Sequence, residues 1–140
     1  MKTKLFLFIL LLTFSLSSNA QKKVRLNKSE RILKGKEWVL DTLQYHKINN
    51  VKADGNIIYF FDRDSNQKDK LAYSKKANPE IFAEVVYGFW LVEKKNLILK
   101  QWDYDLGEEL EPEVYEISKL TKTTLLIKNK NGTFFPFFKK

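Results

Sequence analysis

The sequence predicts an all-β domain: an antiparallel meander β-barrel of about eight strands, preceded by one short helix. Three observations predict it. Short apolar runs recur at spacings of roughly 8–12 residues, polar or Gly-containing turn signals separate them, and helical periodicity is almost absent. The short connections favour strands that pair with their sequence neighbours, and closing the sheet into a barrel removes exposed strand edges. A two-sheet sandwich and a smaller, partly open barrel are the rival architectures.

The first twenty residues have the pattern of a secretory signal peptide. Leu5 to Leu16 is an uncharged apolar run that follows two lysines. Small and polar residues come after it and suit cleavage after Ala20. The run is shorter than the roughly 20 residues that a bilayer-spanning helix needs. We therefore expect residues 1–20 to be removed and residues 21–140 to form one exported domain, periplasmic or secreted, without a transmembrane segment.

The amino-acid composition excludes several kinds of chemistry. The chain contains no Cys, so disulfides, thiol catalysis, thiolate metal sites and lipid attachment at a cleavage-site cysteine are all excluded. An exported domain of this size without disulfides has to be stabilised by its apolar core.

Positive charge dominates the domain but is unevenly distributed. Without the signal peptide, 23 basic and 17 acidic residues leave a formal charge of +6. The segment Gln101–Glu113 holds six acidic residues and no basic one, whereas seven basic residues lie between Lys22 and Lys36. Such a field favours anionic partners such as envelope polymers or acidic proteins, or serves only to keep the protein soluble.

One short helix is predicted at the start of the domain. Asn27 or Ser29 provides the N-cap, residues 30–33 form the turns, and Gly35 ends the helix. The segment covers barely two turns, so we expect it to act as a plug or lid and not as a bundle helix.

Strands are expected throughout the rest of the chain, without a second helix. The first strand is predicted to begin at Lys36 and to continue through Leu43, followed by a polar loop at Gln44–Asn50. The other strands are predicted at 57–61, 71–73, 87–92, 97–101, 114–120, 123–128 and 133–138, with a further one possible in principle at 81–86.

Three local signals define the hairpins. Glu93–Asn96 is the polar centre of a hairpin with apolar arms on both sides. The turn Asn129–Gly132 ends in Asn-Gly, a pair that tolerates the positive φ of tight hairpins. Pro136 lies inside the last strand and marks an edge position or a bulge there, because proline has no N–H to donate to a neighbouring strand.

Three segments of the sequence carry a family resemblance: ILKGKEW, YGFWLVEKKNLILK and YEISKLTKTTLLIK. The matching positions are Leu33, Gly35, Trp38, Gly88, Trp90, Leu97, Leu99, Tyr115, Ile117, Leu120, Thr121, Leu125 and Ile127. Together these segments resemble the secreted lipocalin-like domain proteins of Bacteroidota, and they cover most of the domain. The resemblance implies a meander barrel with one open end and no enzymatic activity.

Aromatic side chains are the candidate ligand-binding residues. Tyr87, Trp90 and Trp102 frame the mid-chain hairpin, and Tyr59 lies on a strand expected to face inward. An aromatic-rich cavity suits a small apolar or amphipathic molecule, and Lys or Arg near the mouth of the barrel would attract an anionic head group. The same aromatic side chains would equally fill a barrel that has no cavity.

No catalytic residue, cofactor or metal ligand is predicted. His46 is the only histidine, and no nucleophile motif accompanies it. The acidic run 101–113 has Leu106 and Gly107 where an EF-hand loop would continue with its third acid and its glycine. Neighbouring acids on one loop are also a poor source of the opposed carboxylates that glycoside hydrolysis requires.

The sequence therefore predicts an exported, non-enzymatic binding protein for a small apolar or amphipathic ligand. The alternative is a protein–protein interaction module, such as an inhibitor or immunity-type protein, that uses the acidic run 101–113 or the basic face. An enzyme ranks third. Basic residues interleaved with aromatic ones also fit single-stranded nucleic acid, but export makes a nucleic-acid partner unexpected.

Overall fold

The computed structural model describes residues 25–62, 71–77 and 84–140. The predicted signal peptide, the segment 63–70 and the beginning of the possible strand 81–86 lie outside these residues. The described elements are α2 (Lys28–Leu33), β1 (Lys36–Leu40), α3 (Thr42–Asn49), β2 (Ile57–Phe61), β3 (Leu71–Ala77), β4 (Glu84–Glu93), β5 (Asn96–Asp103), β6 (Glu108–Glu109), β7 (Glu113–Leu120), β8 (Thr124–Lys128) and β9 (Phe134–Lys139). In the described residues, neither helix has the length and apolar character needed to cross a bilayer.

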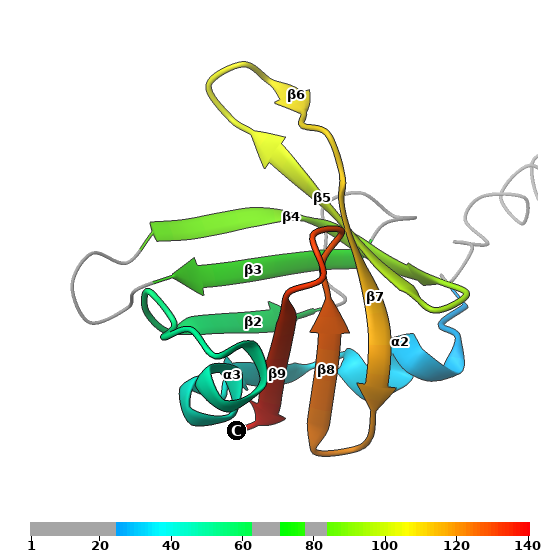
Figure 1. Ribbon diagram of the computed structural model, residues 1–140. Coiled ribbons are helices and arrows are strands. Elements are labelled where there is room, and N and C mark those ends of the chain that lie inside the picture. Colours follow the sequence, from blue (N-terminus) through cyan, green and yellow to red (C-terminus); the bar gives the residue numbers. More distant parts are fainter. Residues whose placement is uncertain (1–24, 63–70, 78–83) are drawn as a thin grey trace, which may run out of the picture.

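Eight of the described strands form a closed antiparallel barrel (Figure 1). The strands pair in the order β1, β2, β3, β4, β5, β7, β8 and β9, and β9 returns to pair with β1. The short strand β6 pairs only with the far part of β5, and this hairpin projects beyond the barrel at the top of Figure 1. The predicted barrel of about eight strands is confirmed, and the continuous ring of pairs excludes a two-sheet sandwich.

Strand alternation decides which side chains fill the barrel. Successive residues of a strand point to opposite faces, so Trp90 and Val92 of β4 face inward together with Leu97 and Leu99 of β5, and all four are at most 5% exposed. The complete buried cluster comprises Leu33, Trp38, Leu40, Tyr59, Phe61, Leu71, Tyr73, Trp90, Val92, Leu97, Leu99, Leu125, Ile127 and Phe137. This apolar core is the main source of stability in a chain without disulfides.

The helix α2 begins with a capping box that also binds the barrel wall. The Asn27 side chain accepts a hydrogen bond from the Glu30 N–H, and the Glu30 carboxylate accepts one from the Asn27 N–H, both at 2.9 Å. Glu30 Oε1 also accepts from the Val92 N–H at 3.1 Å, and Asn27 Nδ2 donates to the Val92 carbonyl at 2.8 Å. Val92 lies beyond Trp90, the last β4 residue that pairs with β3. The capping box therefore satisfies backbone groups at the edge of β4.

The last turn of α2 closes this end of the barrel. Leu33 is fully buried, and its carbonyl accepts a hydrogen bond from Trp38 Nε1 at 3.1 Å. Gly35 follows with a positive φ of 67°, which turns the chain into β1. The predicted short helix is confirmed, with Asn27 as its N-cap and Gly35 just after its end, and it acts as a plug.

The helix α3 contradicts the expectation of strands alone after Gly35. The strand β1 ends at Leu40 and not at Leu43, because Asp41 caps a helix and its carboxylate accepts from the Gln44 N–H at 2.9 Å. The expected polar loop is therefore almost entirely helical. The eight residues of α3 include no buried side chain, so the sequence carries no apolar periodicity that would have marked this helix.

Several strand boundaries also differ from the predicted ones. The strand β3 continues to Ala77. Residues 84–86 of the possible strand 81–86 and the predicted strand 87–92 belong to one strand, β4, from Glu84 to Glu93. Pro136 lies just past the last β1–β9 pair, and its carbonyl accepts from the Asp41 N–H at 2.9 Å. The missing proline N–H therefore falls where β1 leaves the sheet, which is the edge position that Pro136 predicted.

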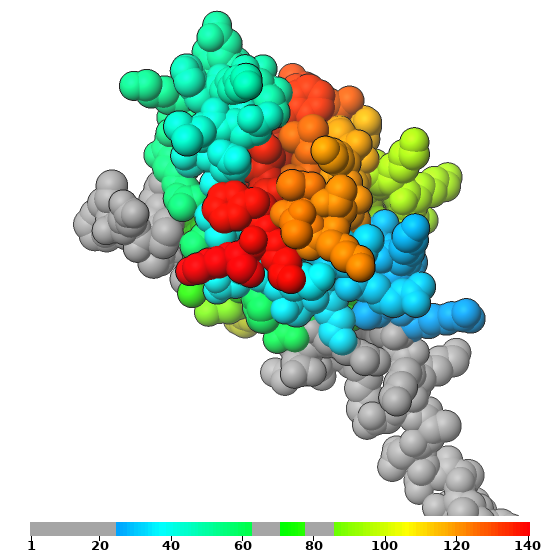
Figure 2. Space-filling model, turned by 90° about the horizontal axis from the view of Figure 1, so that it is seen from below, coloured from blue at the N-terminus to red at the C-terminus, as the bar shows by residue number. Residues whose placement is uncertain are grey.

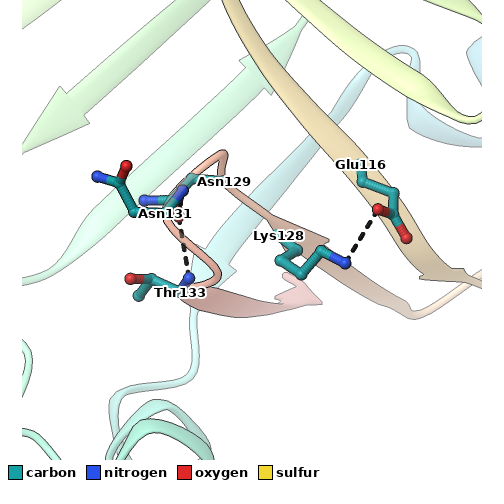
Figure 3. A network of polar contacts seen from close by, with 5 residues as sticks. All are labelled: Glu116, Lys128, Asn129, Asn131 and Thr133. Atoms are coloured by element: carbon teal, nitrogen blue, oxygen red, sulfur yellow. Dashed lines mark hydrogen bonds and ion pairs between the residues drawn. The ribbon is translucent and has the colours of Figure 1, made fainter.

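The turn between β8 and β9 confirms the Asn-Gly signal (Figure 3). The Asn129 side chain accepts hydrogen bonds from the N–H groups of Asn131 and Thr133, at 3.0 and 2.9 Å. Next to the turn, Lys128 and Glu116 form a cross-strand ion pair at 3.0 Å. Both charges are partly exposed, so this pair fixes the register of β7 and β8 more than it adds stability.

Candidate functional site

The barrel interior consists of two chemically different halves. At the α2 end, Trp38, Phe61 and Trp90 are at most 1% exposed, and the Phe61 and Trp90 ring centroids lie 4.9 Å apart. Tightly interdigitated aromatic and aliphatic side chains fill this half. The other half, towards α3, contains polar aromatic side chains and a pocket.

Three tyrosines from different strands form a cluster inside the second half. The Tyr115 hydroxyl of β7 donates to Glu113 Oε2 at 2.7 Å, and Tyr59 of β2 lies near Tyr115. Tyr73 of β3 lies beside Tyr59, with a distance of 6.4 Å between ring centroids. The Lys75 ammonium lies 5.8 Å from the centroid of the Tyr59 ring. The cluster thus brings a carboxylate, a cation and three hydroxyl groups to one region of the barrel wall.

Burial and the Glu113 carboxylate keep these tyrosines neutral. Desolvation is the main cause that raises the pKa of Tyr59 well above its ordinary value, and nearby Tyr115 and Glu113 add to it. Desolvation also raises the pKa of Tyr73, with a smaller contribution from Glu113. Desolvation is also the largest cause that raises the pKa of Tyr115, and the hydrogen bond to Glu113 raises this pKa further. The hydroxyl groups therefore stay protonated above about pH 10 as well, where exposed tyrosines ionise.

We expect the free energy of unfolding to fall as the pH rises above about 10, the ordinary pKa of tyrosine. There the unfolded chain releases tyrosine protons while folded Tyr59 and Tyr73, with raised pKa values, keep theirs. Each such group then favours unfolding by about 1.4 kcal/mol per pH unit. Denaturant titrations at several pH values measure this slope, which should be shallower in the double variant Tyr59→Phe/Tyr73→Phe. Equal slopes in both proteins would contradict the expectation.

A pocket of about 190 Å³ lies between α3 and the barrel. Its apolar lining consists of Leu40, Tyr45, Ala53, Ile57, Ala77 and Phe135. The Tyr45 ring of α3 packs against the Phe135 ring of β9 at 5.5 Å, and Phe135 meets the Tyr115 ring edge-to-face at 6.1 Å. The pocket wall therefore continues directly into the tyrosine cluster. A second pocket, of about 140 Å³, lies on the outer face of β2 and β3 beside Phe60 and Lys76.

Hydrogen bonds from Asn49 hold α3 against the barrel. Asn49 Nδ2 donates to the Phe134 carbonyl at 2.7 Å, and Asn49 Oδ1 accepts from the Phe134 N–H at 3.0 Å. Figure 2 shows α3 lying against the last strands of the chain. The helix therefore forms one fixed wall of the pocket, opposite the strands.

Two polar side chains complete the lining of the pocket. Asp54 and Asn56 come from the connection between α3 and β2. The Asn56 Oδ1 atom is buried and accepts no hydrogen bond from the residues that the structure describes. The pocket therefore combines apolar walls with two polar residues, Asp54 and Asn56.

The structure separates the four aromatic residues predicted to line the interior. Tyr59 is buried at 2% exposure within the tyrosine cluster, and Trp90 is buried in the filled half, where its Nε1 donates to the Asp62 carbonyl at 3.2 Å. Tyr87 is 51% exposed, since it lies one residue before the inward-facing Gly88. Trp102 lies on the part of β5 that pairs with β6, outside the barrel. None of the four is among the described residues that line the pocket, and only Tyr59 belongs to the tyrosine cluster beside it.

Tyr45, Asn56 and Phe135 are site residues that the sequence interpretation missed. Tyr45 lies in the predicted loop Gln44–Asn50 and Asn56 just before the predicted strand 57–61, where neither residue type stands out. Phe135 could have been found, because period-two alternation places it on the same face as the buried Phe137. The missed residues share one property: they come together only through the position of α3.

The remaining polar candidates lie on the surface. His46 is exposed on α3. The acidic run forms the β5–β6 hairpin, where Asp103 Oδ1 accepts from the N–H groups of Asp105 and Leu106. In the described ranges, no three His, Cys, Asp or Glu side chains come together in a way that could hold a metal ion.

Comparisons with known proteins identify no relative. No family model matches the chain, and neither the curated proteins nor the solved structures include a match. A function can therefore be inferred only from the geometry and chemistry of the site itself.

Proposed function

We propose that the protein is an exported, non-enzymatic binding protein for a small apolar or amphipathic molecule, which it holds in the pocket under α3. The observation that carries this proposal is the pocket of about 190 Å³ with aromatic and aliphatic walls at one end of a closed barrel. Export is proposed from the signal-peptide pattern of residues 1–20. The resemblance to lipocalin-like domain proteins supports the same reading.

The volume of the pocket limits the size of the ligand. An engineered apolar cavity of about 150 Å³ holds benzene, whereas pockets for drug-sized ligands measure about 300–1,000 Å³. A pocket of about 190 Å³ therefore fits one substituted ring or a short alkyl chain. A longer molecule would extend past α3 into solvent.

The expected affinity follows from the apolar area that such a ligand buries. One aromatic ring buries about 150–250 Å², which stabilises the complex by about 4–6 kcal/mol at roughly 25 cal/mol per Å². The cost of association is subtracted from this gain, so we expect binding weaker than the dissociation constant of about 1 mM that a net gain of about 4.1 kcal/mol would give.

A matched pair of substitutions on β3 tests the proposal. Ala77 lines the pocket, so Ala77→Phe should fill it and reduce the affinity for benzyl alcohol and ethylbenzene at least tenfold. Ala72 lies on the opposite face of the same strand, so Ala72→Phe should leave binding unchanged. Protein-observed NMR titration measures both, and thermal melts show whether each variant is folded. Equal binding by the two folded variants, or no binding by the wild type, would contradict the proposal.

The β5–β6 hairpin supports a second candidate function, a protein–protein interaction module. The hairpin projects from the barrel and exposes Tyr104 by 73% and Leu106 by 68% within an acidic segment. Exposed aromatic and aliphatic side chains surrounded by one sign of charge suit a basic protein partner. In this case Tyr104→Ser/Leu106→Ser would abolish co-precipitation of that partner, and Ala77→Phe would not affect it.

A further inference from the structure

The helix α3 carries exposed aliphatic side chains on the face that points away from the barrel. Tyr45 and Asn49, one turn apart, hold its inner face against β9. Leu43 and Lys47, also one turn apart, lie on the opposite face, because a helix repeats roughly every 3.6 residues. Leu43 is 84% exposed, and Val51, which follows directly after the C-cap of α3, is 60% exposed. Figure 2 shows that α3 stands out from the molecule, so these side chains protrude into solvent.

Opposite charges lie at the two ends of the barrel. The acidic hairpin of β5 and β6 projects at the top of Figure 1, whereas α2, α3, the β7–β8 turn and the C-terminus lie in its lower part. Six basic residues belong to these lower elements or directly follow them: Arg31, Lys47, Lys52, Lys122, Lys139 and Lys140. Such a distribution of charge orients the protein with its α3 end towards a negatively charged surface.

The acidic residues of the lower elements are engaged in contacts within the domain. Glu30 is buried in the capping box, and the Asp41 carboxylate caps α3. Glu37 pairs with Lys140 at 3.9 Å, and Asp54 lines the pocket. Lys47 and Lys52 are both exposed, so their ammonium groups are accessible to an anionic partner.

An anionic bilayer fits this surface better than a second copy of the chain does. Protruding aliphatic side chains next to lysines are typical of helices that lie in a membrane interface, where the aliphatic groups enter the headgroup layer and the lysines meet lipid phosphates. A symmetric contact between two copies would instead bring Lys47 against the same lysine of the other copy, and such like-charge contacts are unfavourable.

We propose that the α3 end of the barrel binds anionic phospholipid membranes, with Leu43 and Val51 inserted among the headgroups and Lys47 and Lys52 in contact with lipid phosphates. This membrane contact goes beyond the proposed ligand binding and does not require an occupied pocket. Val51 and Lys52 directly precede the pocket residue Ala53 in the chain. Docking in this orientation therefore brings the pocket under α3 next to the bilayer, where apolar and amphipathic molecules concentrate.

Co-sedimentation with phospholipid vesicles tests the proposal on the chain purified without its predicted signal peptide. Vesicles of equal parts phosphatidylglycerol and phosphatidylcholine should bind the protein at least tenfold more tightly than vesicles of phosphatidylcholine alone, since each lysine near an anionic surface contributes roughly fivefold. Raising the NaCl concentration from about 0.1 M to about 1 M shortens the screening length from about 10 Å to about 3 Å. The preference for anionic vesicles should then disappear.

Two double substitutions assign the membrane contact to the α3 end. Leu43→Ser/Val51→Ser removes the inserting side chains, and Lys47→Gln/Lys52→Gln removes two charges, so each should weaken binding to the anionic vesicles at least tenfold. All four residues are exposed, so both variants should keep the thermal melt of the wild type.

The matched control is Tyr104→Ser/Leu106→Ser on the acidic hairpin, where the replaced side chains are similarly exposed, by 73% and 68%. This control should bind anionic vesicles like the wild type. Equal loss in the control and the α3 variants, equal binding to both kinds of vesicle, or no binding to either would overturn the proposal. A change of oligomeric state in Leu43→Ser/Val51→Ser with unchanged vesicle binding would also overturn it and assign the surface to self-association.

The variant Ala77→Phe separates the membrane contact from the proposed ligand binding. It fills the pocket and leaves the outer face of α3 unchanged, so it should bind anionic vesicles like the wild type while it no longer binds benzyl alcohol. Loss of vesicle binding in this variant would show that the membrane contact depends on the pocket and would contradict the proposal.

Discussion

Replacing Gly88 by alanine is expected to destabilise the barrel by about 3 kcal/mol or more. A Cβ atom at this position would overlap the Lys100 carbonyl oxygen and lie 2.8 Å from Tyr73 Cε1 and 3.0 Å from Gln101 Cα. Two of these neighbours are backbone atoms of β5, so the clash cannot be relieved by a side-chain rotation. The β4–β5 pairing that closes the barrel would have to shift, and overpacking of this kind is strongly destabilising.

Chemical denaturation measures the effect, with Gly132→Ala as the control. Gly132 has a positive φ of 87° but nothing within 4 Å of a Cβ atom, so its substitution reports backbone strain alone, about 1 kcal/mol. Gly88→Ala should therefore cost clearly more than the control. A Gly88→Ala protein as stable as Gly132→Ala would show that the strands approach each other less closely than the structure indicates.

Replacing Glu30 by alanine is expected to cost about 3 kcal/mol, although the residue lies on a helix of only six residues. Glu30 is 7% exposed, and its carboxylate accepts hydrogen bonds from the N–H groups of Asn27 and Val92. The substitution leaves two backbone donors without partners at the α2 end of the barrel. An unsatisfied buried donor costs about 1–3 kcal/mol, and the attachment of α2 to β4 is weakened.

The matched control for this prediction is Glu37→Ala. Glu37 is a partly exposed β1 residue whose ion pair with Lys140 measures 3.9 Å, so its loss should cost less than about 0.5 kcal/mol. Denaturant titrations measure the free energy of unfolding of both variants, and the two values are comparable if the m-value is unchanged. If both substitutions cost the same, Glu30 contributes only a surface charge and the capping box does not hold the plug.

The features of the fold that the sequence predicted are those with a local signal. Alternating apolar residues and the Asn-Gly turn at 131–132 predicted the β8–β9 hairpin, and a cap at Asn27 or Ser29 with Gly35 at the end predicted the N-terminal helix. Closure of the barrel followed because short connections restrict each strand to its neighbours. The β6 strand was not predicted, since two acidic residues carry no strand signal.

The helix α3 could not be predicted, and with it most of the site was missed. Its residues have no apolar periodicity, and its cap, Asp41, continued the alternation of the preceding strand. Tyr45 joins Phe135 only because Asn49 attaches the helix to β9. Contacts of this kind depend on tertiary packing and leave no local pattern in the sequence.

The prediction that both Tyr87 and Trp90 line the interior conflicts with the alternation of side chains along a strand. Tyr87 and Trp90 are three residues apart on one strand, so period two places them on opposite faces. With Trp90 buried at 1% exposure, Tyr87 has to point outward, as the structure shows. The interior around Trp90 is filled, so this large aromatic residue packs the core of the barrel and does not line a ligand pocket.

The most direct test of the account is the site of benzyl alcohol binding, mapped by NMR chemical-shift changes on the protein. The account predicts that the largest changes fall on Tyr45, Asn56 and Phe135, the residues of the pocket under α3. Changes centred on the outer pocket beside Phe60 and Lys76, or changes spread evenly over the surface, would contradict it.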